Sequence, residues 1–304
     1  MSVNNGSNVG GFVSENSGKI EKCSFKGKVT GKKYIGGFVS VNKNTIKDCT
    51  AEVDVITGLN YVGGFAYKND AGIYNCTAKG VIKAQTDTKK NICGGFVVEN
   101  NSTIEGCFAE GEVIGKNCAG GFCAINRCDI HSSEAKCATY AYTMCQSVCV
   151  GGFVAYNEKG NINKCISSGF DLKKYALIDC TLAHAESNTG KARAGGFVGV
   201  NNANITDSEA IGYVYVSGGP DKPDSDCGGF VGTNDKNGYI CDCFVEAKIS
   251  TTNDIEGSGF VGKALNRSVI RNSACKSKRA GDSSKFYYIK EPDAVIENCR
   301  AIKN

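Results

Sequence analysis

A seven-residue pattern, Gly-Gly-Phe-Val-x-x-Asn, recurs along the whole chain and restricts its fold more than any other feature. Other small apolar residues take the Val position in two copies, at Ala66 and Cys123. Eight copies begin at Gly10, Gly36, Gly63, Gly94, Gly120, Gly151, Gly195 and Gly228, and a ninth has Ser258 in place of its first glycine. The starts lie 26 to 44 residues apart. Because self-similarity at such a period is typical of stacked repeats, we expect residues 1–304 to form a single solenoid.

A second pattern, Ile-x-x-Cys, follows the asparagine. Its cysteines are Cys23, Cys49, Cys76, Cys107, Cys165, Cys243 and Cys299, and serine takes their place at Ser133, Ser208 and Ser273. After this position apolar residues alternate with polar ones, as where Ala51, Val53 and Val55 are separated by charged residues. Successive strand residues point to opposite faces, so we expect these three side chains to face inward.

Together the two patterns predict an all-β fold, a parallel β-solenoid (β-helix) of about ten coils of 26–33 residues. Equivalent residues would stack about 4.8 Å apart along a rod on the order of 50 Å long. We expect a right-handed winding, the usual hand of parallel crossovers. The glycine pair would allow a tight corner directly above the corner of the next coil. The asparagines would form a hydrogen-bonded ladder and the phenylalanines a stacked column.

The residue after each phenylalanine is also apolar, which a flat strand does not explain. Either the chain bends at the corner and buries both side chains, or a stripe of valines is exposed along the rod as a contact surface. The burial of Val39 and Val97 distinguishes the two interpretations.

Insertions precede several of the Gly-Gly pairs, at residues 85–92, 140–148, 170–194, 217–226 and 251–256. We expect them along one edge of the rod, and insertions on one face often mark the binding face of a repeat protein. Residues 170–194 would include a partial extra coil at 177–182, residues 217–227 a loop, and residues 1–8 an N-terminal tail.

This insertion edge supplies the candidate site for a glycan or protein partner. Its members are aromatic, basic or acidic side chains from the insertions: Tyr140, Tyr142, Lys173, Lys174, His184, Arg193, Asp221, Asp224 and Asp226. The three aspartates also suggest calcium, although their spacing matches no known calcium loop and a solvated turn is the simpler interpretation.

The chain contains 18 cysteines. The seven in the Ile-x-x-Cys pattern are expected to be reduced thiols packed as small hydrophobic residues, because stacked parallel side chains suit disulfide geometry poorly. The other eleven leave core packing, one or two disulfides and a metal site open. There is no Cys-x-x-Cys pair and only His131 and His184 are available, so we expect no metal and no cofactor.

Other functional classes have little support. A net charge of +4 is too weak to indicate nucleic-acid binding, and no stretch of 18 apolar residues predicts a membrane span. The first residues do not resemble a signal peptide. The catalytic motifs of common hydrolases and nucleotide-binding proteins are missing, and the outward charges of the predicted strands are typical of an ordinary salt-bridged surface.

The copies at Gly196-Phe197-Val198-Gly199 and Gly229-Phe230-Val231-Gly232, each followed by Asn and Ile-x-x-Cys or Ile-x-x-Ser, resemble GLUG repeats. The resemblance covers nearly the whole chain, although earlier copies have Ser, Ala, Val or Tyr at the second motif glycine. GLUG repeats occur in bacterial surface and secreted proteins, including IgA-cleaving metallopeptidases, where they accompany a catalytic domain. The resemblance therefore implies a β-solenoid stalk or binding region and carries no catalytic residue across.

We accordingly expect a non-enzymatic, adhesin-like structural and binding module that contacts its partner through the insertion edge. The alternatives are a self-assembling subunit that stacks end to end and a carbohydrate-active β-helix enzyme, which would need a groove lined by at least two carboxylates with perturbed pKa values. We expect a segment of a longer extracellular or cell-surface protein, since solenoids need capped ends, with a cytoplasmic chain as the other option.

Overall fold

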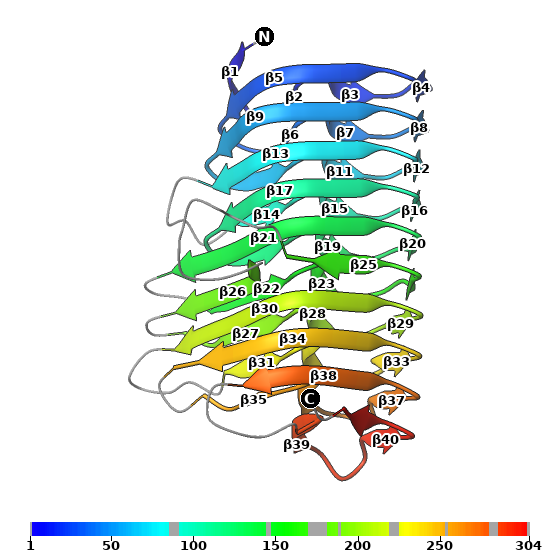
Figure 1. Ribbon diagram of the computed structural model, residues 1–304. Coiled ribbons are helices and arrows are strands. Elements are labelled where there is room, and N and C mark those ends of the chain that lie inside the picture. The colour runs from blue at the N-terminus through cyan, green and yellow to red at the C-terminus, as the bar shows by residue number, and fades with distance from the viewer. Residues whose placement is uncertain are drawn as a thin grey trace.

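The computed structural model is a rod of stacked coils that runs from β1 to β41 (Figure 1). It describes residues 2–84, 91–143, 147–169, 181–187, 190–218, 225–252, 255–279 and 285–302. A full coil contributes one strand to each of four parallel sheets, here called A, B, C and D in the order in which the chain visits them. The described residues form no helix long and apolar enough to cross a membrane. The predicted parallel β-solenoid is confirmed.

Sheet A contains the longest strands. They are β1 (Ser2–Gly6), β5 (Ser24–Gly31), β9 (Thr50–Gly58), β13 (Thr77–Ala84), β17 (Phe108–Gly115), β21 (Glu134–Thr143), β25 (Ile166–Ser168), β26 (Thr181–Ser187), β30 (Glu209–Gly218), β34 (Phe244–Thr251), β38 (Ala274–Arg279) and β41 (Arg300–Ala301).

Each strand of sheet B ends at the first residue of the Gly-Gly pair, or at Ser258 in the last copy. Its strands are β2 (Val9–Gly10), β6 (Ile35–Gly36), β10 (Tyr61–Gly63), β14 (Ile92–Gly94), β18 (Cys118–Gly120), β22 (Val148–Gly151), β27 (Ala192–Gly195), β31 (Asp226–Gly228) and β35 (Gly257–Ser258).

Sheet C begins directly after the phenylalanine. Its strands are β3 (Val13–Asn16), β7 (Val39–Asn42), β11 (Ala66–Asn69), β15 (Val97–Asn100), β19 (Cys123–Asn126), β23 (Val154–Asn157), β28 (Val198–Asn201), β32 (Val231–Asn234), β36 (Val261–Ala264) and β39 (Tyr287–Lys290).

Sheet D holds the isoleucine of the second pattern. Its strands are β4 (Ile20–Glu21), β8 (Ile46–Lys47), β12 (Ile73–Tyr74), β16 (Ile104–Glu105), β20 (Ile130–His131), β24 (Ile162–Asn163), β29 (Asn204–Thr206), β33 (Tyr239–Cys241), β37 (Val269–Arg271) and β40 (Val295–Glu297).

The Gly-Gly pair forms the corner between sheets B and C, as predicted. A Cβ on Gly36 would lie 1.8 Å from the carbonyl oxygen of Val39 in the same turn. A Cβ on Gly37 would lie 2.0 Å from the carbonyl oxygen of Gly64 in the next coil. The first glycine thus permits the turn itself, and the second permits the stacking of one turn on another.

The bend at this corner buries both apolar residues of the motif. Val39 and Val97 have no exposed surface, and neither have the phenylalanines that precede them. The phenylalanine rings stack with centroids 4.5 to 4.9 Å apart from Phe12 to Phe286. The exposed valine stripe is therefore wrong, and the predicted aromatic column is confirmed.

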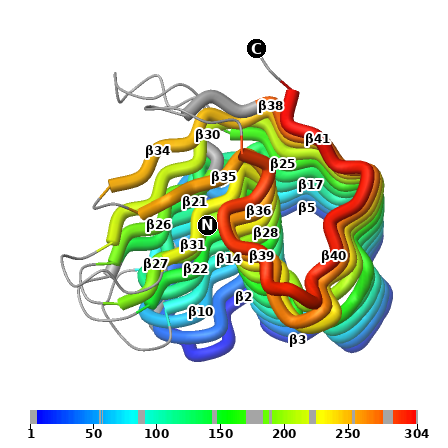
Figure 2. The backbone as a smooth tube through the Cα atoms, turned by 90° about the horizontal axis from the view of Figure 1, so that it is seen from below, coloured from blue at the N-terminus to red at the C-terminus, as the bar shows by residue number. Residues whose placement is uncertain are grey.

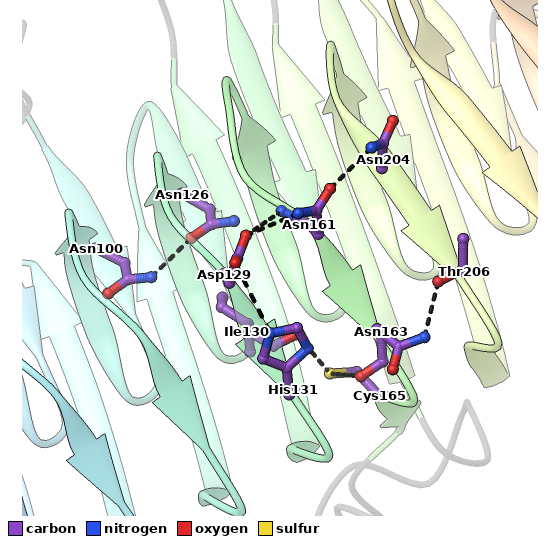
Figure 3. Close-up of polar contacts among 10 residues, drawn as sticks. All are labelled: Asn100, Asn126, Asp129, Ile130, His131, Asn161, Asn163, Cys165, Asn204 and Thr206. Carbon is purple, nitrogen blue, oxygen red and sulfur yellow. Dashed lines mark hydrogen bonds and ion pairs between the residues drawn. The ribbon is translucent and has the colours of Figure 1, made fainter.

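The motif asparagines form a buried ladder beside this column. The side-chain amide of Asn100 donates to Oδ1 of Asn126 at 2.9 Å, and the same bond repeats from Asn16 to Asn234 (Figure 3). A second, exposed ladder lies outside it, where Asn204 donates to Asn161 and Asn161 to Asp129. The inner ladder pairs amides that would otherwise be buried without partners.

The cysteine positions form a third ladder, in which a thiol with a coil on either side both donates and accepts a hydrogen bond. The thiol of Cys76 donates to the carbonyl of Tyr74 at 3.2 Å and accepts the backbone N–H of Cys49 at 3.4 Å. Ser133 makes the same two bonds, to the carbonyl of His131 and from the N–H of Cys107. Cysteine and serine interchange here because both are small and both donate and accept, whereas the sequence indicated only small size.

Two features of the described residues differ from the expectations. A bulge at Asp54 shifts the alternation in β9, and Ile56 is buried two residues beyond it. Residues 2–6, expected within an N-terminal tail, form β1 and pair with β5.

The long insertion is described only in part. Residues 170–180 lie outside the described residues, and they hold most of the expected partial extra coil. On either side of them, β25 and β26 both pair with β21 and β30, so they occupy one rung of sheet A. The described residues on either side of the gap therefore belong to one coil.

Candidate functional site

The structure divides the predicted site residues between two faces. Tyr140, Tyr142 and His184 lie on the outer face of sheet A. Arg193 and Asp226 are paired neighbours in sheet B. Lys173, Lys174, Asp221 and Asp224 lie outside the described residues. Sheets A and B are joined along one edge of the rod, where their inner faces pack together, so their outer faces point in different directions (Figure 2).

On sheet A, rings from three successive rungs lie one above another. Tyr140 is in register with His184, and His184 with Tyr215. The ring centroids of Tyr140 and His184 are 5.6 Å apart, and those of His184 and Tyr215 are 4.5 Å apart. We call Tyr140, Tyr142, His184 and Tyr215 the aromatic strip.

The aromatic strip has polar groups at its edges. Nζ of Lys116 lies 5.3 Å from the centroid of the Tyr142 ring, a cation–π contact. Nε2 of His184 lies 3.6 Å from Oε2 of Glu186. Burial lowers the pKa of His184 below its usual value of 6.5, despite the opposing charge of Glu186, so the imidazole is neutral at pH 7.

An open hollow of about 710 Å³ adjoins the strip. Its lining combines the faces of two tyrosines with two lysine side chains and apolar strand residues: Lys83, Ala84, Ile114, Gly115, Lys116, Tyr140 and Tyr142. Such a surface offers flat apolar contacts with donors around them, the combination typical of sites for polar organic ligands.

Sheets B and C meet at an angle (Figure 2). We call the region where their outer faces adjoin the outer corner. Val98, Cys118, Ala124, Cys149 and Ala155 are buried there as a small hydrophobic cluster separate from the main core. Outward-pointing residues are thus buried on this side of the rod.

The second motif glycine belongs to the outer corner. A Cβ on Gly199 would lie 2.5 Å from Sγ of Cys149, and one on Gly232 would lie 2.7 Å from the carbonyl oxygen of Gly199. Glycine is therefore needed at these two positions of the outer corner. In earlier coils the same position holds Ala124 and Ala155, both buried. Those coils have room for a methyl group there, so the second motif glycine is not required in every copy.

Tyrosines occupy the outer corner near the N-terminal end. The ring centroids of Tyr34 and Tyr61 are 5.4 Å apart, those of Tyr34 and Tyr67 are 4.7 Å apart, and those of Tyr61 and Tyr67 are 5.5 Å apart. Burial raises the pKa values of Tyr61 and Tyr67, so both hydroxyls remain protonated at neutral pH.

Toward the C-terminal end the described residues of the outer corner include one carboxylate and three cations that contact it. Oδ1 of Asp226 lies 2.9 Å from Nζ of Lys263, and Oδ2 lies 3.3 Å from Nε of Arg193 and 3.5 Å from Nζ of Lys191. The hydroxyl of Thr233 also donates to Oδ2. We call these five residues the charged cluster.

Burial dominates the electrostatics of the charged cluster. It raises the pKa of Asp226 above its usual value, while Thr233, Lys191 and Arg193 act in the opposite direction. Burial, together with the charges of Lys191 and Arg193, lowers the pKa of Lys263 to about 8. Burial disfavours the charged form of both groups, and repulsion from Lys191 and Arg193 adds to the shift of Lys263 only.

The cysteines are spread over several faces. Sixteen are described and all are free thiols, including the seven of the ladder. Burial raises the pKa of Cys93 and Cys149 to about 12, so these thiols stay protonated. Among the described residues, no group of three His, Cys, Asp or Glu side chains is placed to hold a metal ion.

Two described carboxyl groups have raised pKa values, and they do not form a pair. Burial is the main cause for both Glu112 and Asp226. Glu112 lies on β17 of sheet A and Asp226 on β31 of sheet B. The outward charges of sheet A form ordinary surface ion pairs such as Lys26 with Glu52 and Lys79 with Glu110.

Sequence reasoning missed Lys191, Thr233 and Lys263. Arg193 and Asp226 each stand two residues before the Gly-Gly pair, and Thr233 and Lys263 each stand three residues after the phenylalanine. Comparing these two repeat positions across the coils would have brought them together, because equivalent residues stack. Both positions lie in the repeat itself, outside most of the insertions from which the candidate residues come.

Comparison with known proteins gives one match. The family model described as the GLUG motif matches residues 5–30. No curated protein matches the chain. No solved structure matches it either.

Proposed function

We propose that this chain is a non-enzymatic structural and binding module of a secreted or cell-surface protein, and that it binds a glycan through the aromatic strip. The observation that carries the proposal is the row of rings formed by Tyr140, His184 and Tyr215 on three successive rungs, with successive ring planes tilted by 50° and 53°, beside an open hollow. The match of residues 5–30 to the GLUG motif supports the role of a repeat module.

A glycan suits this surface for chemical reasons. A sugar ring has an apolar C–H face that packs on a flat aromatic ring, and hydroxyl groups around its rim that need hydrogen-bonding partners. Tyr140 and Tyr142 offer rings with hydroxyl groups, and Lys83 and Lys116 line the same hollow. Rings on successive rungs form a row along the rod, which matches an extended chain of sugars.

A glycan-binding comparison tests the proposal. Wild type, Tyr140→Ala and Tyr215→Ala would be applied to an array of neutral and acidic glycans, with Tyr74→Ala as the control. Tyr74 lies on sheet D, away from the strip. We expect at least a tenfold loss of binding for the two strip variants and no change for Tyr74→Ala. Equal binding by all four proteins would refute the role of the strip.

Self-association is a second proposal with an observation in its favour. Phe12, the first ring of the aromatic column, is 47% exposed, and among the described residues Phe38 is the one ring that stacks on it. Light scattering with small-angle X-ray scattering over a range of concentrations tests it. Mass that grows with concentration, and falls for Phe12→Ser, would support stacking; a constant monomeric mass would rule it out.

A further inference from the structure

We propose that the charged cluster binds one oxyanion group of a ligand, a carboxylate or a sulfate, at the outer corner of the rod. The proposal concerns a different face from the aromatic strip and does not depend on it. It rests on the arrangement of Lys191, Arg193 and Lys263 around Asp226.

The charged cluster has a sealed inner part and an accessible outer part. The side chains of Asp226 and Lys263 are 0% and 5% exposed, whereas those of Lys191 and Arg193 are 22% and 29% exposed. Solvent, and any ligand, therefore meets Lys191 and Arg193 first.

The accessible part of the cluster presents hydrogen-bond donors. Oδ2 of Asp226 is occupied by Thr233, Arg193 and Lys191, and Oδ1 faces Lys263. The carboxylate is thus surrounded by its own partners, which leaves it poorly placed to bind a cation. The cluster suits an acceptor-rich, negatively charged ligand.

Arg193 has the geometry for such a ligand. Its Nε donates to Oδ2 of Asp226 at 3.3 Å, which orients the planar guanidinium, and the described residues accept no bond from its two Nη groups. Two parallel N–H groups match two oxygens of a carboxylate or sulfate. The contact with Asp226 therefore positions Arg193 for a bidentate interaction.

The charges favour the same ligand. The four ionisable side chains carry three positive charges and one negative charge when all are ionised. The lowered pKa of Lys263 reflects repulsion from Lys191 and Arg193 in addition to burial. A bound oxyanion would offset that repulsion, so we expect it to raise the pKa of Lys263.

The test uses two anions and a neutral control. Sodium sulfate, a uronic acid monosaccharide and its neutral parent sugar would be titrated into the labelled full chain at constant ionic strength. The readout is the NMR signals of Arg193 Nε and Lys263 Nζ. We expect saturable shifts with sulfate, with the uronic acid or with both, and none with the neutral sugar.

Variants separate this site from general salt effects. Arg193→Gln should weaken anion binding at least tenfold. Arg193→Lys keeps the positive charge, so it should weaken binding less, and it replaces Arg193→Gln in the test if the glutamine variant does not fold. Arg271→Gln is the matched control, because Nε of Arg271 also contacts a carboxylate, Glu297, but on sheet D. Saturation by sulfate alone or by the uronic acid alone identifies the group preferred and supports the proposal. Shifts that do not saturate with either anion, or that persist unchanged in Arg193→Gln, overturn it.

Discussion

At the scale of single residues, the corners of this solenoid depend on atoms that are missing from glycine side chains. A Cβ on Gly121 would lie 2.0 Å from the carbonyl oxygen of Gly152 in the next coil. Such an approach cannot be relieved by moving a side chain, since the atom it meets is backbone. Each corner therefore constrains the coil that follows it.

Gly121→Val should destabilise the rod by about 3 kcal/mol or more, because it forces neighbouring backbones apart. Hydrogen exchange should quicken most in the coils of β18 and β22, since a repeat contacts only its neighbours. Gly18→Ala is the control, because nothing lies within 4 Å of an added Cβ there. An unchanged urea midpoint for Gly121→Val would contradict the role of the corner.

The thiol ladder makes a second prediction at this scale. Cys76→Ser should change the free energy of unfolding by less than about 1 kcal/mol, because serine keeps both hydrogen bonds. Cys76→Ala should cost about 1–3 kcal/mol, since it leaves the N–H of Cys49 without an acceptor. The carbonyl of Tyr74 loses the thiol but keeps the backbone N–H of Asp48. Urea unfolding in a reducing buffer measures both. If Cys76→Ala is as stable as Cys76→Ser, the hydrogen bonds of the thiol do not contribute and only the size of the side chain matters for stability.

At the scale of elements, the inner asparagine ladder couples one coil to the next. Asn126→Ala should cost about 2–5 kcal/mol, because it leaves the Asn100 amide without an acceptor and Oδ1 of Asn157 without a donor. Asn204→Ala, in the exposed outer ladder, should cost less than about 1 kcal/mol. Adding Asn157→Ala to Asn126→Ala should cost less than the sum of the two, which a double-mutant cycle measures. Strict additivity would show that the ladder bonds act independently.

The charged cluster predicts a pH dependence. Folding lowers the pKa of Lys263 from 10.5 to about 8, so between these pH values the unfolded state binds more protons. The stability contributed by Lys263 therefore rises with pH across this window, by up to about 3 kcal/mol. Asp226, Lys191 and Arg193 are the charged groups that face it.

Urea unfolding of wild type and Lys263→Met from pH 7.5 to 10.5 measures this effect. The difference between the two free energies of unfolding should move in favour of wild type as pH rises. Lys248→Met, an exposed lysine on sheet A, serves as the control. A difference that stays constant, or moves the other way, would contradict the linkage.

Elements that repeat were predictable from the sequence, and contacts between elements were less so. The ladder of Asn100 and Asn126, the column of Phe96 and Phe122 and the corners followed from periodicity, since equivalent residues must stack. The tenth ring, Phe286, was missed because it lacks the Gly-Gly pair, although it precedes Ile296 by ten residues, as Phe260 precedes Ile270.

The charged cluster was only half predicted, and for a physical reason. Arg193 and Asp226 were chosen from the insertions, but their partners Thr233 and Lys263 come from sheet C. Contact between the outer faces of sheets B and C depends on the angle at the corner, and hydrophobic periodicity carries no information on that angle. The sequence also did not show that Tyr140 and Arg193 lie on different faces of the rod, because this too depends on the angle between two sheets.

At the scale of the whole molecule, coils should be removable in complete units. Deleting residues 94–119 joins Cys93 to Gly120 where Ala119 stood, and Cys93 and Ala119 are register partners. We expect the shortened chain to fold, with its long dimension reduced by about 4.8 Å in small-angle scattering. Deleting residues 94–106 would join sheet B to sheet A in the wrong phase and should prevent folding. Failure of the complete deletion, or success of the half deletion, would contradict this modularity.

The asparagine ladder also gives the rod a direction. All seven of its bonds run the same way, from the Nδ2 of one asparagine to the Oδ1 of the asparagine in the following coil, from Asn16 to Asn234. The column is thus a row of dipoles aligned head to tail, each polarising the next. Reversing a single amide would set donor against donor on one side and acceptor against acceptor on the other. Backbone groups hold the same direction, because the N–H groups of Gly18 and Ala203 donate to Oδ1 of Asn16 and Asn201. The row therefore keeps one direction, and the molecule carries an electrical polarity along its length that its small net charge conceals.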